Sequence, residues 1–323
     1  MQTDEFYMRR CLQLAVNGRL RAKPNPMVGA VIVAPDGRII GEGYHAKCGE
    51  GHAEVNAFAS VKPADEALLP QCTMYVSLEP CAHWGKTPPC ANLIVSKGMK
   101  RVVCGCIDPF AKVKGRGVQI LRNAGIEVTV GVLEKECLEL NKAFITVNTL
   151  KRPYIILKWA QTANGCMGLL QQGRPQPISI STPTTQRVVH KLRAEVDAIL
   201  VGAGTWKADH PQLNVRAWYG PDPERILISA HATQAPEGFW LAHSTNEVVS
   251  HLNEEGKQSL LVEGGAHTLQ SFIAAELWDE IRVETAINRT AEGIAAPQVP
   301  HNAHITRLET YDNNIITYYE RNK

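Results

Sequence analysis

The sequence predicts an α/β protein made of two domains, and three observations support this prediction. The chain has 323 residues, which is enough for two domains with separate hydrophobic cores. Short apolar runs typical of strands alternate with amphipathic segments typical of helices in each half. The segment Lys151-Arg152-Pro153 lies between the two alternations, so we expect domains at residues 1–148 and 149–323.

In the first half we expect a mixed sheet with helices on its faces. Tyr7, Cys11 and Leu14 recur on one face of the opening helix, and Gly18 follows its end. A β-hairpin around the turn Pro35-Asp36-Gly37 then leads into βα units. The expected elements are helix 4–17, strands 28–33 and 39–44, helix 53–61, strand 74–78, helix 91–97, strand 101–104, helix 117–124, strand 127–130 and helix 134–144.

The second half starts a new alternation of strands and helices. Thr182-Pro183 is typical of a helix start, because threonine suits the N-cap and proline suits the first helical position. The expected elements are strand 154–159, helix 184–194, strands 198–201, 225–229 and 259–262, helix 268–275, and strands 280–284 and 315–319.

Composition and charge exclude several classes of protein. Lys plus Arg number 34 and Asp plus Glu 32, so the net charge requires neither a nucleic-acid nor a membrane partner. No apolar run approaches the length of a membrane span, and the polar first residues are not a secretory signal. Nine cysteines, an odd number, indicate reduced thiols, so we expect a cytoplasmic protein.

One group of residues is typical of a hydrolytic zinc centre: His52, Glu54, Cys81 and Cys90. One imidazole and two thiolates leave a fourth tetrahedral position for water, whose pKa the metal lowers to about 7. A carboxylate that is not a ligand, here Glu54, can carry protons between that water and a leaving amine. Zinc deaminases show this arrangement as H-x-E followed by P-C-x-x-C.

Local geometry predicts where these residues lie. Residues two apart on a helix face different ways, so His52 and Glu54 can reach one metal only if His52 precedes the first turn. The segment Gly49-Glu50-Gly51 breaks regular structure just before His52 and favours this position. Cys90 likewise precedes an apolar helix, whose unpaired N–H groups stabilise a thiolate.

The stretch between the two cysteines departs from the deaminase pattern, because eight residues separate Cys81 from Cys90. The insert contains Lys86 and Thr87, a cation and a hydroxyl beside a glycine, which predicts a phosphate-binding loop. The alternative is a closed structural zinc site with His83 or another cysteine as fourth ligand. Such a site has no use for a carboxylate two residues from a ligand.

Two glycine-rich segments follow buried-looking strands in the second half. They are Gly202-Ala203-Gly204 and Gly264-Gly265. Ligands in open α/β sheets bind outside the carboxyl ends of strands, where glycines let the backbone approach a phosphate. Neither segment has the full G-x-G-x-x-G spacing, and glycine pairs are more often tight turns than cofactor sites.

The two halves together resemble the bifunctional riboflavin-biosynthesis family, in which a pyrimidine deaminase is fused to a pyrimidine reductase. The resemblance covers essentially the full length. The first-half motifs are Pro24-Asn25-Pro26-Met27-Val28-Gly29, Gly43-Tyr44-His45, Gly51-His52-Ala53-Glu54, Leu78-Glu79-Pro80-Cys81, Gly85-Lys86-Thr87-Pro88-Pro89-Cys90 and Gly115-Arg116-Gly117. The second-half motifs are Leu192-Arg193-Ala194, Asp197-Ala198-Ile199-Leu200-Val201-Gly202, Asp209-His210-Pro211-Gln212-Leu213 and Val262-Glu263-Gly264-Gly265.

For the first domain, the resemblance implies a cytidine-deaminase-like fold that deaminates a diaminopyrimidinone carrying a ribosylamino 5′-phosphate. Zn²⁺ would be the cofactor, and Glu54 would move protons. The zinc ligands implied are His52, Cys81 and Cys90. The implied substrate residues are Asn25, His45 and Asp108 for the sugar, with Lys86 and Thr87 for the phosphate.

For the second domain, the resemblance implies a dihydrofolate-reductase-like fold that uses NADPH to reduce the ribosyl group to a ribityl chain. The implied cofactor residues are Ala160, Thr205, Asp209 and the loop from Gly265. The implied substrate residues are Lys158, Arg193, Leu213, Arg216 and Glu263. Positions that depart from the usual family pattern are Asn164, Ser179, His210 and Ser229.

Two other functions are compatible with the motifs. One is a deaminase of nucleosides or tRNA whose second half only binds or dimerises, although tRNA binding favours a basic face. The other is a non-catalytic scaffold stabilised by zinc. We favour an enzyme acting on a small phosphorylated pyrimidine, with no nucleic-acid or membrane partner, and expect a homodimer.

Overall fold

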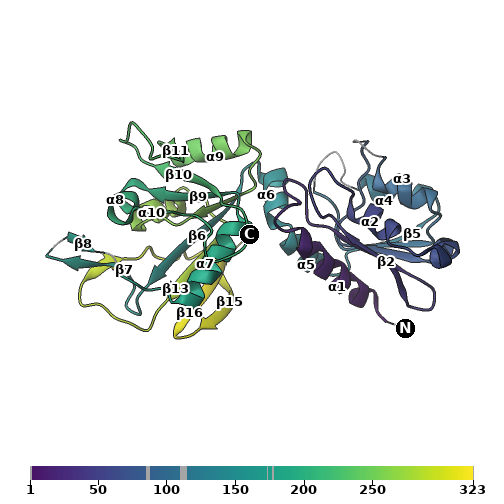
Figure 1. The fold of residues 1–323 in the computed structure, drawn as a ribbon, viewed down its shortest axis with the longest axis horizontal. Coiled ribbons are helices and arrows are strands. Elements are labelled where there is room, and N and C mark those ends of the chain that lie inside the picture. The colour runs from purple at the N-terminus through teal and green to yellow at the C-terminus, as the bar shows by residue number, and fades with distance from the viewer. Residues whose placement is uncertain (1, 85–87, 110–114, 173, 177, 323) are drawn as a thin grey trace. The chain divides into compact units, whose positions relative to one another are not determined.

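The computed structural model describes residues 2–84, 88–109, 115–172, 174–176 and 178–322 (Figure 1). The chain divides into two compact units, Met1–Lys151 and Arg152–Lys323. The division falls just after the helix that ends at Leu150. Both units are α/β folds, so the predicted fold class is confirmed.

The first unit is built on a five-stranded sheet in the order β2-β1-β3-β4-β5. Strand β1 is antiparallel to β2 and β3, whereas β3, β4 and β5 run parallel, so the sheet is mixed as predicted. The elements are α1 (Asp4–Ala15), a 3₁₀ turn (Val16–Gly18), β1 (Gly29–Val33), β2 (Ile39–Tyr44), α2 (Ala53–Ala59), a 3₁₀ segment (Pro63–Gln71), β3 (Thr73–Val76), α3 (Cys90–Ser96), β4 (Arg101–Cys104), α4 (Arg116–Asn123), β5 (Glu127–Val130), α5 (Glu134–Leu140) and α6 (Lys142–Leu150).

Helices cover both faces of this sheet, which explains why its strands are almost continuously apolar. Ala30 and Ile32 of β1 pack in one core with residues of α2, α3 and α4. Val31 and Val33, which point to the opposite face, pack in a second core with α1 and α5. The alternation of side chains along one strand therefore feeds two separate cores.

The prediction of a single helix at residues 134–144 is wrong, because the chain forms two helices, α5 and α6, with a break at Asn141. The buried side chain of Asn141 pairs with the backbone of Met27 in both directions. Met27 N donates to Oδ1 (2.8 Å), and Nδ2 donates to Met27 O (2.9 Å). This long-range pairing fixes the position of Asn141 at the break, and no local pattern reveals it.

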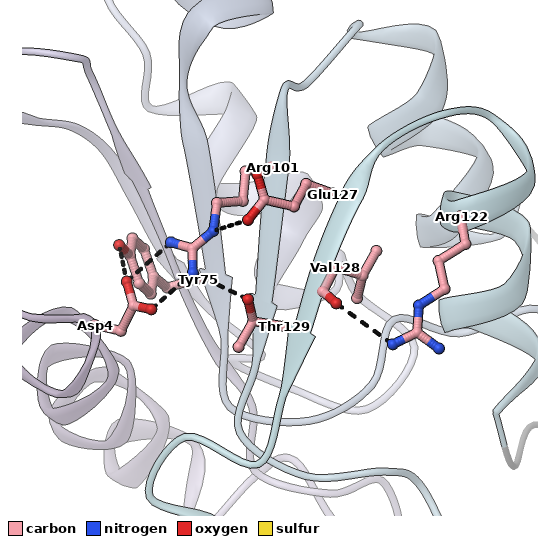
Figure 2. A network of polar contacts seen from close by, with 7 residues as sticks. All are labelled: Asp4, Tyr75, Arg101, Arg122, Glu127, Val128 and Thr129. Atoms are coloured by element: carbon pink, nitrogen blue, oxygen red, sulfur yellow. Dashed lines mark hydrogen bonds and ion pairs between the residues drawn. The ribbon is translucent and has the colours of Figure 1, made fainter.

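A polar network fastens the start of α1 to the sheet (Figure 2). The guanidinium of Arg101 donates to both carboxylate oxygens of Asp4 (2.9 and 2.7 Å), to Glu127 (3.1 Å) and to Thr129 (3.0 Å). Tyr75 OH also donates to Asp4 (2.8 Å). The hydrogen bond from Arg101 holds the pKa of Asp4 below its ordinary value.

The second unit contains an eight-stranded sheet in the order β11-β10-β9-β12-β6-β13-β16-β15 and a three-stranded sheet β14-β7-β8. Neighbouring strands run parallel from β11 to β13, and β16 and β15 add antiparallel pairs. The elements are β6 (Tyr154–Gln161), β7 (Cys166–Gln171), β8 (Arg174–Gln176), α7 (Pro183–Glu195), β9 (Ala198–Gly202), α8 (Ala203–Asp209), β10 (Glu224–Ile228), β11 (Phe239–Ala242), α9 (Thr245–Glu254), β12 (Ser259–Val262), α10 (Ala266–Ala274), β13 (Glu280–Thr285), β14 (Gly293–Ala295), β15 (Ala303–Tyr311) and β16 (Asn314–Arg321).

The main core of this unit lies between the parallel strands and helices α9 and α10. Leu157 of β6 and Leu200 of β9 pack there with Leu252 of α9 and Phe272 of α10. The predicted helix start at Thr182 is confirmed: its hydroxyl accepts from Thr185 N, and Pro183 is the first helical residue.

Several elements of this unit were not predicted: β7, β8, α8, β11, α9, β14 and β15. Strand β15 shows the reason, because most of its residues are exposed and it lies at the edge of the sheet. Such a strand lacks the alternation of apolar and polar residues that marks a half-buried strand. Within the described residues, no helix combines the length and apolar character that crossing a membrane requires.

Candidate functional sites

The predicted metal ligands lie together beside the carboxyl ends of parallel strands in the first unit. His52 is the extended residue just before α2, as its spacing from Glu54 predicts, and Cys90 begins α3. Nδ1 of His52 lies 3.6 Å from Cys81 Sγ and 3.3 Å from Cys90 Sγ. Glycines bring α2 close to its strand, since a Cβ on Gly41 or Gly43 would collide with the helix backbone.

These residues fit a zinc ion. Bond lengths of about 2.0–2.3 Å in a tetrahedron place two ligand atoms about 3.5 Å apart, close to the distances found. Among the described residues, His52, Cys81 and Cys90 are the group placed to hold one metal ion. His83 is exposed and is not part of this group, so the structure gives no support to it as a fourth ligand.

The carboxyl of Glu54 is buried next to the ligands and is hydrogen bonded to Cys90. Burial, followed by the charge of Cys81, raises the pKa of Glu54 to about 7. A hydrogen bond from Cys90 lowers the pKa of Cys81 below its ordinary value, and the same bond raises the pKa of Cys90. The N–H of Cys90 at the start of α3 also donates to Cys81 Sγ (3.2 Å), as expected for a thiolate near a helix end.

Two of the predicted sugar-binding residues form a fixed pair beside the metal ligands. His45 Nδ1 lies 3.1 Å from the carbonyl oxygen of Gly51, so this nitrogen donates, and Nε2 accepts from Asn25 Nδ2 (3.1 Å). The ring of His45 meets that of His52 edge-on, with 5.3 Å between centroids. Burial lowers the pKa of His45, which favours its neutral form.

Of the three remaining predicted deaminase residues, the structure describes one. Asp108 is buried in the segment after β4. Lys86 and Thr87 lie outside the described residues.

Glu79 is a buried carboxylate to which the sequence assigned no role. It accepts the main-chain N–H groups of Asp108 (3.2 Å), Gly115 (2.9 Å) and Val118 (3.2 Å). It therefore ties the segment that leads to the predicted zinc ligand Cys81 to Asp108 and to the start of α4. The sequence signal that could have revealed this role is a carboxylate two residues before Cys81, in the otherwise apolar motif Leu78-Glu79-Pro80-Cys81.

The second unit has a large cavity at the carboxyl ends of its parallel strands, with a volume of about 1210 Å³. Its lining includes the predicted cofactor residues Ala160, Thr205, Asp209 and Gly265. It also includes both glycine-rich segments. A Cβ on Gly202 or Gly264 would collide with Thr268, so glycine allows the close approach of α10 there, whereas Gly204 faces open space and leaves the main chain accessible to a phosphate. These features fit a dinucleotide.

A smaller pocket of about 230 Å³ contains four of the predicted reductase substrate residues: Lys158, Arg193, Arg216 and Glu263. Arg193 forms two bonds with Glu263, at 3.1 and 2.8 Å. Burial raises the pKa of Glu263, but Arg193 and Lys158 outweigh burial, so that the pKa lies below its ordinary value. Leu213 does not line either cavity; it is a buried residue with a left-handed backbone (φ 53°).

The structure also shows where the positions that depart from the family pattern lie. Asn164 bonds Thr290 through its side chain in both directions (2.8 and 3.1 Å) and so holds the turn after β6. Ser179 and Ser229 line the large cavity. His210 ends α8 with a left-handed backbone.

Residues that sequence reasoning missed in the small pocket include His190 and Gln186. Both lie on α7. His190 is three residues before Arg193, and Gln186 is four residues before His190, so the three side chains share one face of the helix. This periodicity was the signal that could have found them.

The fold and the two sites define a two-domain enzyme that joins a metal-binding deaminase unit to a nucleotide-binding reductase unit. Comparisons agree with this class. Residues 1–106 match the cytidine and deoxycytidylate deaminase zinc-binding region, and residues 153–286 match the RibD C-terminal domain.

The chain is 38% identical to the riboflavin biosynthesis protein RibD of Aquifex aeolicus, over 91% of this chain and 90% of that protein. It is 35% identical to RibD of Bacillus amyloliquefaciens, over 86% and 83%. A solved structure from Thermotoga maritima, described as a diaminohydroxyphosphoribosylaminopyrimidine deaminase/5-amino-6-(5-phosphoribosylamino)uracil reductase, covers 98% of both chains with 34% identity and a TM-score of 0.89. RibD of Acinetobacter baumannii covers 98% of both chains with 29% identity and a TM-score of 0.86.

The chain belongs to the RibD family of riboflavin-biosynthesis proteins. It is therefore a bifunctional deaminase and reductase, with a cytidine-deaminase-like first domain and a dihydrofolate-reductase-like second domain. Its cofactors are Zn²⁺ and NADPH.

Proposed function

We propose that the first unit hydrolyses the exocyclic amine of a diaminopyrimidinone that carries a ribosylamino 5′-phosphate. The second unit then reduces the ribosyl group of the product to a ribityl chain. The solved relative from Thermotoga maritima, described by these two activities, supports the choice of substrate. The observation that carries the proposal is the buried carboxyl of Glu54 beside a cluster of three zinc-type ligands.

In the deaminase site, we assign proton movement to Glu54. His52, Cys81 and Cys90 would hold zinc, which would supply the Lewis acidity that activates water at neutral pH. Glu54 is buried beside these three residues and is not one of them, so its carboxyl can take the proton of the attacking water and deliver it to the leaving amine. The products are the pyrimidinone carbonyl and ammonia.

Binding groups surround this centre. We assign Asn25 and His45 to the sugar, because their mutual hydrogen bond orients both side chains beside the ligand His52. Asp108 has the same assignment and is held by Glu79. Lys86 and Thr87 are assigned to the phosphate from the sequence alone.

In the reductase unit, the chain's residues position two ligands. NADPH supplies the hydride. Ala160, Thr205, Asp209 and Gly265 line the cavity that we assign to it. The basic residues Lys158, Arg193 and Arg216 suit the substrate phosphate, with Glu263 holding Arg193 in place. Leu213 is assigned to the substrate by resemblance, through the loop that it shares with Arg216.

A coupled assay tests the function. Purified protein is supplied with the diaminopyrimidine phosphate, with and without NADPH. Ammonia release should not depend on NADPH, whereas NADPH oxidation should require prior deamination. Chelation of zinc should abolish ammonia release and leave reduction of already deaminated substrate intact. Full ammonia release from metal-free protein would contradict the proposed deaminase mechanism.

The phosphate assignment has its own test. Lys86→Ala should weaken binding of the phosphorylated substrate much more than binding of its unphosphorylated form. Equal weakening of both would refute the assignment. We further propose a cytoplasmic homodimer, which light scattering after size exclusion would test.

A further inference from the structure

The cofactor cavity of the second unit is larger than a single small ligand requires. Its volume of about 1210 Å³ exceeds the ~300–1,000 Å³ usual for pockets that hold drug-sized ligands. It shares Lys158 and Glu263 with the small substrate pocket. This inference rests on the proposed reductase function. Hydride transfer requires contact between the nicotinamide and the substrate, so the nicotinamide end of NADPH must lie at the end of the cavity that contains Lys158 and Glu263.

The strand order then fixes where the other end of the cofactor lies. The glycine-rich ends of β9 and β12 suit the pyrophosphate, and next to β9 come β10 and then β11. Strand β11 is about 14 Å from β12 at the usual spacing of strands. The adenosine half of the cofactor therefore belongs at the carboxyl ends of β10 and β11.

This end of the cavity carries a cluster of imidazole and hydroxyl groups, formed by Ser229, His231, His243 and Ser244. Nδ1 of His243 donates to the main-chain oxygen of Ser229 (3.0 Å), and Oγ of Ser229 accepts the main-chain N–H of His231 (3.3 Å). The two histidines therefore flank one residue at the end of β10. Because Nδ1 of His243 is engaged, Nε2 is the nitrogen that can meet a ligand.

We propose that His231 and His243 bind the 2′-phosphate that distinguishes NADPH from NADH, with the hydroxyl of Ser244 as a further donor. A phosphate next to an imidazole favours its protonated form, which then gives a charge-assisted hydrogen bond. Histidine is suited to this role because its charge changes near neutral pH.

One carboxylate also contacts the cluster. Glu247 accepts the main-chain N–H of His243 (2.7 Å), and its own N–H donates to Ser244 Oγ (3.2 Å), so Glu247 belongs to the cap of α9. Its negative charge opposes an anion. Because this repulsion offsets part of the attraction from one imidazole, we expect both His231 and His243 to be needed for selectivity toward the 2′-phosphate.

The test uses the full-length protein and two probes that differ only in the 2′-phosphate. Calorimetric titration at pH 6.5 measures the Kd of adenosine 2′,5′-bisphosphate and of AMP. The wild type should bind the bisphosphate at least 10-fold more tightly. The double variant His231→Ala/His243→Ala should lose most of this ratio, about 10-fold or more, because each charge-assisted bond contributes about a factor of ten. Its affinity for AMP should stay within twofold, which also shows that the unit is folded.

The matched control is His301→Ala, which removes an exposed histidine that does not line the cavity and should leave both Kd values unchanged. An unchanged ratio in the double variant, or equal weakening of both probes, would overturn the proposal. If NADPH is still oxidised with substrate in that case, only this inference is wrong. If neither probe binds the wild type and NADPH is not oxidised, the proposed reductase function fails as well.

Discussion

The two functional regions are assembled in opposite ways. The candidate metal ligands of the first unit come from short segments between residues 52 and 90, each at the start of a helix or in the segment after a strand. The cavity of the second unit draws on residues from 158 to 294, contributed by the ends of several parallel strands. A metal centre needs a few atoms within one bond length of a point, whereas a dinucleotide needs a long surface. Local motifs can specify the first, but only sheet topology can build the second.

Two buried glutamates show what this difference means chemically. Burial and a neighbouring thiolate raise the pKa of Glu54 to about 7, so it can exchange protons. Glu263 is also buried, but Arg193 and Lys158 outweigh burial and lower its pKa, so it remains charged and holds cations. The same side chain thus becomes a proton carrier in one unit and an electrostatic anchor in the other, because its partners differ.

Glu54→Gln should have the largest effect and tests whether the two regions are separable. The amide cannot carry protons, so deamination should fall by about 10²–10⁴-fold while zinc content is kept. Reduction of deaminated substrate should be unchanged. Glu66→Gln, which alters an exposed carboxylate of the same unit, serves as control. Near-normal ammonia release from Glu54→Gln would remove this residue from its role.

Arg193→Met tests the anchoring role of Glu263. It leaves a buried carboxylate without its bidentate partner, and we expect the free energy of unfolding of the second unit to fall by about 3 kcal/mol. Urea unfolding monitors this loss. Arg321→Met, which breaks a surface pair with Glu276, should cost less than about 1 kcal/mol. Equal effects of the two changes would show that burial of the Arg193 pair has no energetic consequence.

Glu79→Gln tests whether a carboxylate that contacts no substrate still positions the deaminase site. The amide keeps one acceptor oxygen but turns an N–H donor toward main-chain N–H groups. The KM of deamination should rise about 10-fold, with kcat within threefold and zinc content intact. Glu127→Gln in the same unit is the control. A lower melting temperature with unchanged KM would assign Glu79 a purely structural role.

The smallest effect is expected at Asp4, which belongs to neither candidate site. Because Arg101 lowers its folded pKa, Asp4 stabilises the fold above the ordinary carboxyl pKa of about 3.9, and this stabilisation is lost as pH falls through the folded value. Asp4→Asn should therefore lower the free energy of unfolding at pH 7 by about 1 kcal/mol. It should also flatten the acid dependence of stability, followed by thermal unfolding between pH 3 and 7. An unaltered acid profile would contradict the role of this pair.

Much of the fold could be predicted because buried strands carry a strong local signal. Strands β2, β4, β5 and β12 begin and end at the predicted residues. The exposed strand β15 could not be predicted, because its residues show no dominant apolar pattern. Helix α9 was missed although Ser244 and Glu247 form its cap and Val248 and Leu252 lie four residues apart on its buried face. The break at Asn141 was missed for another reason: its partner Met27 is remote in sequence.

The sequence by itself determined the α/β class of both halves and pointed to the residues that the structure brings together as candidate metal ligands. The spacing of His52, Glu54, Cys81 and Cys90 encodes a local chemical requirement. Only the tertiary structure decided that Glu79 joins three main-chain donors, that Glu54 and Glu263 have opposite pKa shifts, and that His231 and His243 flank one residue. These properties depend on distances between residues far apart in the chain and on burial, and both are set by packing rather than by any single segment.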